Sequence, residues 1–257
     1  MPNDETVIEE KVEHAEQEEP TEEQKNMAQV EVRDNVPIDF NKTLKDFHWI
    51  YYHGHGLTMG NANIGNPMSN AKWMGLSIGK CPMDLMVYQE ILFDTRPDII
   101  IEAGTAAGGS ALFLAQMCEL MGTGAVITID IKQGPYYRPH PRLNYLQADI
   151  TTPDTYEYVR RAIAATDYGR AMFIFDDDHH KDHVLEEMEM YAELVSPGCF
   201  MIVEDTNING NPVYPEYGPG PKEAVLDFVN KHPEFMPDYS KHKFLMTCNP
   251  GGYLRRI

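Results

Sequence analysis

The feature that most constrains the fold is a regular alternation of apolar, strand-like runs and helical segments from residue 98 onward. Apolar strands separated by helices are typical of a parallel sheet with helices on both faces. We therefore expect an α/β, doubly wound sheet that is mostly parallel. The pattern predicts strands at 98–101, 125–131, 143–149, 171–176 and 199–205, and helices at 111–121, 154–165, 181–195 and 221–232.

The end of the chain predicts a closing strand pair, from FMPDYS at 235–240 and KFLMTC at 243–248. This adds an antiparallel C-terminal strand to the expected sheet. The 257 residues suffice for one α/β domain and are few for two. We expect residues 1–35 to be an acidic disordered tail and 36–257 to be a single domain, in which 36–97 form an N-terminal helical and loop cap region.

Charge and composition exclude several classes of protein. The chain has 40 acidic and 21 basic residues, a net charge of −19, so a nucleic-acid partner is not expected. No run approaches the roughly 20 apolar residues that span a bilayer. The N-terminus has neither the basic nor the apolar region of a secretory signal. The four cysteines form no CxxC pair, which fits a reducing cytoplasm. We also expect a homo-oligomer.

The acidic tail gives a first testable prediction. Residues 1–35 hold 12 acidic and 3 basic side chains and no aromatic residue, so they bury too little surface to offset the entropy of ordering. Deleting them should leave the melting temperature and the affinity for a small-molecule cofactor nearly unchanged. Calorimetry and thermal unfolding measure both quantities, and a drop of many degrees would show instead that the tail docks.

The first motif with chemical meaning is IIIEAGTAAGGS at 99–110, a strand, a glycine-rich turn and a helix start. Glycines allow close approach of the backbone to a ligand, and the helix N-terminus offers free N–H donors. Ala106 breaks the GxGxxG dinucleotide pattern. The spacing acid-x-Gly-x-x-x-Gly, from Glu102 through Gly104 to Gly108, fits the first motif of S-adenosylmethionine methyltransferases better. A purely structural strand–turn–helix joint is the alternative.

Two further acids stand at the ends of the next two predicted strands. Asp130 ends the second strand, where a carboxylate can accept hydrogen bonds from both ribose hydroxyls of a cofactor. Asp149 ends the third strand and is placed to meet an adenine amino group. Each acid alone would more often be a solvated loop residue. Glu102, Asp130 and Asp149 stand at the ends of three successive strands, and together they indicate a nucleoside-binding site at this edge of the sheet.

A third group of acids follows the fourth and fifth strands. Asp176 ends FIFD, and Glu204 with Asp205 ends MIVED. Parallel strand ends lie side by side, and converging carboxylates repel one another unless a cation or proton lies between them. Oxygen ligands favour Mg²⁺, with Mn²⁺ as a substitute. The alternatives are ordinary acidic loops, or a non-haem iron site in which His179 or His180 joins a carboxylate.

Four segments together resemble the cephalosporin hydroxylase / rhamnosyl O-methyltransferase family: KWMGLSIGKCPMDLMVYQEI, IIIEAGTAAGGSALFLA, FIFDDDHH and MIVEDTNI. The resemblance covers roughly residues 70–257 and implies a Rossmann-like methyltransferase sheet of class I, with S-adenosylmethionine and Mg²⁺ as cofactors and sugars or glycosylated natural products as substrates. It implies the metal ligands Asp176, Glu204 and Asp205, and His179 as general base in the D-x-x-H spacing from Asp176. The cofactor residues that it implies are Glu102, Gly104, Ser110 and Asp130. Thr105 and Gly108 of the same glycine-rich turn, and Asp149 from its position, complete the predicted cofactor set.

The expected function is therefore metal-assisted methylation of a sugar hydroxyl. Tyr214 and Tyr217 could stack on a sugar ring, and His53 and His55 could border the site, although loop packing and solvation are the simpler interpretations of these residues. Two other functions stay open. An iron-dependent oxygenase would consume oxygen without S-adenosylmethionine. A non-catalytic adaptor on a methyltransferase fold would not bind the cofactor.

Overall fold

The computed structural model describes residues 29–31, 37–54, 58–59, 62–63, 65–132, 134 and 137–257. The chain divides into two compact units, Met1–Thr43 and Leu44–Ile257. In the first unit, β1 (Gln29–Glu31) pairs antiparallel with β2 (Pro37–Asp39). The predicted disordered tail, 1–35, otherwise lies outside the described residues.

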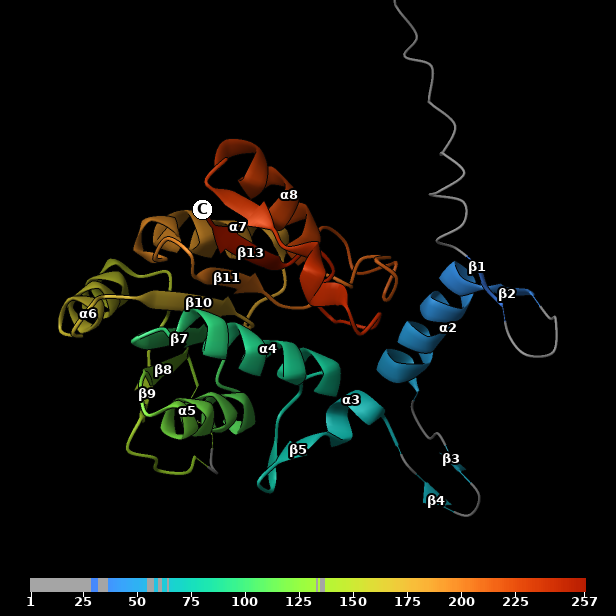
Figure 1. Cartoon of the computed structure of the whole chain (residues 1–257), viewed down its shortest axis with the longest axis horizontal. Helices are drawn as coiled ribbons and strands as arrows, with labels where there is room; N and C mark the ends of the chain where they lie inside the picture. The colour runs from blue at the N-terminus through green and yellow to red at the C-terminus, as the bar shows by residue number, and fades with distance from the viewer. Residues whose placement is uncertain are drawn as a thin grey trace, which may run out of the picture. The chain divides into compact units, whose positions relative to one another are not determined.

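A seven-stranded sheet forms the centre of the second unit (Figure 1). Its order is β12-β13-β11-β10-β7-β8-β9, and the five strands from β11 to β9 run parallel. β13 is antiparallel to β11, as expected of a C-terminal strand. The strands are β7 (Ile99–Ala103), β8 (Ala125–Asp130), β9 (Leu143–Gln147), β10 (Ala171–Phe175), β11 (Phe200–Val203), β12 (Phe235–Pro237) and β13 (Tyr253–Arg256).

Helices cover both faces of this sheet. Figure 1 shows α4 and α5 together on one side, and α7 and α8 together on the other. Every residue of the three central strands β7, β10 and β11 is buried, which explains why their sequences are apolar except for Glu102 of β7. The helices are α4 (Pro82–Thr95), α5 (Gly109–Met121), α6 (Pro153–Ala164), α7 (Lys181–Tyr191), which continues as the 3-10 turn η1 (Ala192–Leu194), and α8 (Pro221–Lys231).

Local sequence explains where these helices begin and end. α4, α6 and α8 each start on proline, whose fixed φ suits the first helical turn. The hydroxyl of Thr152 accepts a hydrogen bond from Thr155 N at 3.3 Å and so caps α6. α5 ends before Gly122, which adopts the left-handed conformation at φ 75°.

The predicted strand at 243–248 is wrong. The strand that pairs with both β12 and β11 is β13, which begins at Tyr253. Residues 243–248 form a turn instead, with Leu245 at φ 68°. Cys248 N donates to the buried carboxylate of Asp84 at 2.8 Å, and Cys248 O accepts from Asn207 N at 3.1 Å. Because loops and side chains satisfy this backbone, it does not pair in the sheet.

Short elements precede the sheet. They are α2 (Phe40–His53), β3 (Thr58–Met59) with β4 (Ala62–Asn63), α3 (Pro67–Asn70), and β5 (Lys72–Trp73) with β6 (Leu76–Ser77). One further short element, the 3-10 turn η2 (Tyr239–His242), follows β12. The aromatic helix α2 has no counterpart among the helices predicted above. Within the described residues, no helix has the length and apolar character needed to cross a membrane.

Candidate active site

The register of the parallel strands aligns their carboxyl ends. Ala103 of β7 lies opposite Ile129 on one side and Phe175 on the other, and Phe175 lies opposite Val203. The next residues therefore form one row. Backbone hydrogen bonds continue this row, from Gly104 N to Ile129 O (2.8 Å), from Asp176 N to Ala103 O (3.0 Å) and from Glu204 N to Phe175 O (3.0 Å). The structure thus brings the predicted strand-end residues to one edge.

Gly104 is required at this edge by two features of the backbone. It adopts φ 89°, and a Cβ atom placed on it would lie 2.0 Å from the carbonyl oxygen of Asp176. Any side chain would push the glycine-rich turn away from β10. The backbone that follows β7 therefore lies in close contact with Asp176, the first of the acidic residues after β10.

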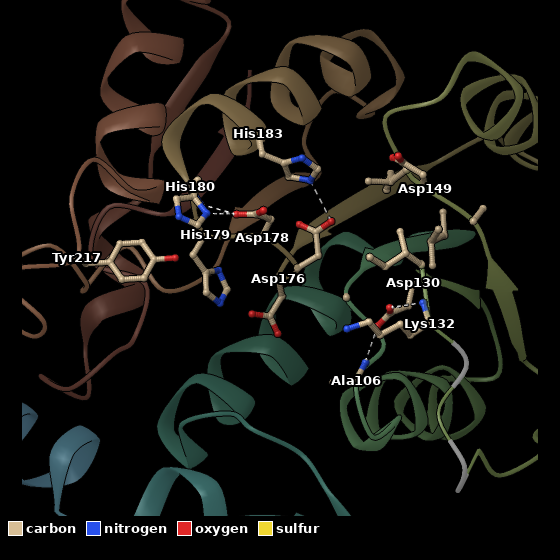
Figure 2. Close-up of a pocket in the computed structure, with 16 residues that line it drawn as sticks. Ala106, Asp130, Lys132, Asp149, Asp176, Asp178, His179, His180, His183 and Tyr217 are labelled. Carbon is tan, nitrogen blue, oxygen red and sulfur yellow. Dashed lines mark hydrogen bonds and ion pairs between the residues drawn. The ribbon is translucent and has the colours of Figure 1, made fainter.

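A cavity of about 580 Å³ opens above the row (Figure 2). Three of the residues predicted to bind a cofactor, Gly104, Asp130 and Asp149, line it. Figure 2 shows Asp130, Lys132 and Ala106 on one side and His179, His180 and Tyr217 on the other. The lining contains five aspartates and one lysine: Asp130, Asp149, Asp176, Asp177, Asp178 and Lys132. Such a lining gives a negative potential that favours a cationic ligand.

Asp130 holds the turn above β7 as well as lining the cavity. Its Oδ2 accepts hydrogen bonds from Thr105 N (3.1 Å) and Ala106 N (3.0 Å), and its Oδ1 accepts one from Lys132 N (2.8 Å). A carboxylate has about four acceptor positions, so capacity for one further donor remains. Asp149 is exposed, and hydrogen bonds from Thr151 lower its pKa.

The other predicted cofactor residues lie deeper. Glu102 is fully buried, accepts a hydrogen bond from Thr128 Oγ1 at 2.6 Å, and has a pKa that burial raises to about 7. Gly108 precedes α5 at φ 78°. Thr105 and Ser110 line a second hollow of about 310 Å³, which Asp176, His179 and Asp205 also line.

Three predicted metal or catalytic residues converge. Potential ligand atoms of Asp176, His179 and Asp205 all lie within 4.8 Å of one another, and His179 Nε2 lies 3.1 Å from Asp205 Oδ2. Burial raises the pKa of both aspartates. Asp205 Oδ1 is buried and has no hydrogen-bond partner among the described residues. A buried oxygen without a partner is costly, and a bound cation would satisfy it.

Asp205 adopts an uncommon backbone conformation that aims it at this group. Its φ is 54°, in the left-handed region that few residues other than glycine adopt. Asp205 N donates to Asn249 Oδ1 at 3.1 Å, which fixes this conformation. Strained backbone of this kind is common at functional sites.

Glu204, predicted as the third metal ligand, is placed differently. Its Oε1 lies 2.9 Å from Lys80 Nζ and accepts a hydrogen bond from the hydroxyl of Tyr88, and the carboxylate is buried. Lys80 Nζ also contacts Asp176 Oδ2. Burial alone would lower the pKa of Lys80, but the charges of Asp176 and Glu204 outweigh it and raise that pKa. A buried ammonium therefore lies between two of the three predicted ligands.

The sequence analysis missed Lys80 and Tyr88. Lys80 precedes α4 and Tyr88 lies within it, far from the acids in the sequence. The only signal was that both belong to the segment KWMGLSIGKCPMDLMVYQEI, which carried part of the family resemblance. No spacing rule connects them with Glu204.

The predicted substrate residues gather at the rim of the site. Trp49, His53, Tyr214 and Tyr217 line a hollow of about 350 Å³, and Tyr217 also lines the large cavity. The His53 ring lies 4.0 Å from that of Trp49 and 4.0 Å from that of Tyr214. Trp49, which sequence reasoning missed, is 47% exposed. His55 lies outside the described residues.

The ligand set of an iron-dependent oxygenase differs from the group of residues found here. The facial triad of iron oxygenases has two histidines and one carboxylate. The group formed here has one histidine and two carboxylates. His180 instead contacts Asp178, with 2.6 Å between His180 Nδ1 and Asp178 Oδ1, and both side chains are exposed.

The chain is similar in sequence to a known family of proteins. A family model described as rhamnosyl O-methyltransferase/CmcI matches residues 66–257. Rhamnosyl O-methyltransferase of Mycobacterium tuberculosis is 37% identical over 194 residues, covering 72% of this chain and 77% of that protein. The protein of the same name from Mycobacterium leprae is 35% identical over 191 residues, covering 72% and 82%.

The fold also resembles solved structures. One described as "cmcI-D160 Mg-SAM" is similar with a TM-score of 0.60 at 23% identity, covering 77% of this chain and 82% of the other. Another, "cmcI-N160 SAH", has a TM-score of 0.58 at 20% identity, covering 80% and 89%. At these identities the likeness shows the fold, which is the mostly parallel α/β sheet expected from the sequence.

Proposed function

Because this chain belongs to the rhamnosyl O-methyltransferase/CmcI family, we propose that it transfers a methyl group from S-adenosylmethionine to a sugar hydroxyl with the help of Mg²⁺. The observation that carries this proposal is the convergence of Asp176, His179 and Asp205 beside the acid-lined cavity. One edge of the sheet then serves cofactor, metal and acceptor.

The large cavity is the proposed cofactor site. S-adenosylmethionine supplies a methyl group on a positively charged sulfonium, and the aspartates of the cavity complement that charge. Asp130 accepts one ribose hydroxyl at its remaining acceptor position, and Asp149 accepts the adenine amino group. Gly104, Thr105, Gly108 and Ser110 form and border the turn that approaches the cofactor, and buried Glu102 supports it from below.

The residues present fit a hard divalent cation. Asp176 and Asp205 provide oxygen ligands, and the partnerless Oδ1 of Asp205 is available to one. Glu204 is the proposed third ligand, held beside them by Lys80 and Tyr88. Bound Mg²⁺ would lower the pKa of a neighbouring sugar hydroxyl. The positive charge of Lys80 offsets part of the repulsion among these carboxylates.

His179 is the proposed general base. Its Nε2 faces Asp205 Oδ2 at 3.1 Å, so with Nε2–H donating to Asp205, Nδ1 is the ring nitrogen that can take a proton. Asp205 orients the imidazole in this arrangement and stabilises it once it is protonated. Asp176 shares the group and positions the reacting hydroxyl.

The aromatic hollow at the rim is the proposed acceptor site. Trp49, His53, Tyr214 and Tyr217 offer ring faces suited to stacking on a sugar. Tyr217 lines both this hollow and the cofactor cavity, which makes the two spaces neighbours. His179 lines the cofactor cavity together with Tyr217, so the proposed base and the proposed acceptor site share this boundary.

The decisive experiment is transfer of a labelled methyl group from S-adenosylmethionine to a panel of mono- and oligosaccharides, with Mg²⁺ and with EDTA. Label should appear in a sugar only when metal is present. Absence of transfer together with oxygen uptake would favour the oxygenase. Absence of cofactor binding would favour the adaptor. The location in the cytoplasm and the homo-oligomer stay predictions from the sequence.

The cofactor assignment makes a separate prediction at Asp130. Asp130→Ala should weaken S-adenosylmethionine binding roughly ten- to a hundred-fold, because a charge-assisted hydrogen bond is worth about 1.5–3 kcal/mol. The loss includes the hydrogen bonds that hold Thr105 and Ala106 in place. Calorimetry measures the affinity, and Asp154→Ala, in the first turn of α6, is the control. An unchanged affinity would contradict the assignment.

A further inference from the structure

A second group of potential ligands lies at the wall of the large cavity. Asp177, His183 and Glu187 bring one ligand atom each within 4.8 Å of one another. His183 Nε2 lies 3.2 Å from Asp177 Oδ2 and 3.8 Å from Glu187 Oε1. Asp177 follows β10, and the other two side chains belong to α7, one helical turn apart. The function proposed above gives no metal-binding or catalytic role to these three residues.

Glu187 is the unusual member. It is fully buried, and neither of its carboxylate oxygens has a hydrogen-bond partner among the residues that the structure describes. Burial raises its pKa well above the ordinary value. Burying a carboxylate without partners is costly unless a proton or a cation neutralises it. A proton shared between Glu187 and Asp177 would neutralise only one of the two carboxylates, whereas a divalent cation held with His183 would compensate both.

The two ligand groups are separate because neighbouring residues diverge at the end of β10. Asp176 contacts Lys80 and joins the group with His179 and Asp205. Asp177 turns toward α7 and contacts His183. Figure 2 shows the side chain of Asp176 pointing away from His183. Successive side chains of an extended chain point to opposite sides, so adjacent aspartates can serve different sites.

We propose that Asp177, His183 and Glu187 form a second divalent-cation site that takes a transition metal such as Zn²⁺ in preference to Mg²⁺. An imidazole nitrogen with two carboxylates suits Zn²⁺, whereas Mg²⁺ prefers oxygen ligands and retains its water. Three protein ligands leave a fourth position, and Asp177 and His183 line the cavity from which water can fill it. The cation joins the end of β10 to α7 and lowers the negative charge of the cavity wall.

Zinc binding to the full-length protein tests this site. The protein is stripped of metal and carries Asp205→Asn, which disables the first group, and Zn²⁺ is titrated in by calorimetry with Mg²⁺ in large excess. One equivalent of Zn²⁺ should bind. Adding Glu187→Gln or His183→Ala should weaken it by more than roughly a hundred-fold, since even loss of a supporting hydrogen bond at a metal costs about 10- to 100-fold.

The matched control is His180→Ala. His180 lines the same cavity and contacts an aspartate, but it lies outside the group, so its removal should leave zinc affinity unchanged. Circular dichroism checks that each variant folds. X-ray absorption of the Zn²⁺-loaded Asp205→Asn protein should show one imidazole at about 2.0–2.1 Å, which tests the site without altering it. Absence of zinc binding, or binding that survives both Glu187→Gln and His183→Ala, would overturn the proposal.

Discussion

Asp205→Ala is expected to abolish metal-dependent methyl transfer while leaving S-adenosylmethionine binding intact. Asp205 provides the buried oxygen without a partner and also contacts His179. Its loss therefore removes a proposed metal ligand and the residue that orients the proposed base. The cofactor cavity is lined by other residues, among them Gly104, Asp130 and Asp149, so binding of the cofactor should persist.

The measurements are methyl transfer with Mg²⁺ or EDTA, and cofactor affinity by calorimetry. Asp182→Ala is the matched control, because Asp182 is an exposed aspartate in the first turn of α7 and lines neither the large cavity nor the second hollow. It should retain EDTA-sensitive activity. If the Asp205 variant keeps full activity and the wild-type protein is insensitive to EDTA, there is no catalytic metal at this site.

His179→Ala is the second large effect. As general base, His179 contributes a factor of roughly 10²–10⁴ to kcat. The variant should lose activity by this factor with little change in the affinity for S-adenosylmethionine or Mg²⁺. Because His179 Nε2 faces Asp205, a supporting role at the metal is the competing interpretation.

Kinetics at several Mg²⁺ concentrations separate the two roles. A base cannot be replaced by more metal, so the rate should stay low at saturating Mg²⁺. Restoration of the rate by excess Mg²⁺, with weakened Mg²⁺ affinity, would assign His179 to the support of the metal. Asp177 or water would then be the better candidate for the base. His180→Ala, a change of the adjacent exposed histidine, is the control and should keep near-normal kcat.

Most of the sheet could be predicted because its signals are local. The runs at 99–103, 171–175 and 200–203 are apolar except for Glu102, and that pattern follows directly from burial on both faces. The C-terminal strand was misplaced because KFLMTC is as apolar as a strand. Its backbone is satisfied by Asp84 and Asn207, which are remote in sequence, so no local pattern could reveal the turn.

The sequence by itself determined that Asp130, Asp176, Glu204 and Asp205 stand at strand ends on one edge. That follows from the period of strands and helices, because parallel strands joined by helices must end on the same side. The glycine-rich turn at Gly104 and the buried strands could be predicted from the sequence in the same way. The strand-end acids could be identified without knowing what packs above them.

Only the tertiary structure decided how those acids are partnered. Lys80, 96 residues before Asp176, is buried between Asp176 and Glu204, and Tyr88 of α4 reaches Glu204. In the same packing, potential ligand atoms of His179 lie close to those of Asp176 and Asp205. Those of Asp177 lie close to His183 and the buried Glu187. A buried charge must be neutralised by whatever lies within a few ångströms, and that depends on which distant segments pack over the edge. Strand and helix periodicity carry no information about this packing.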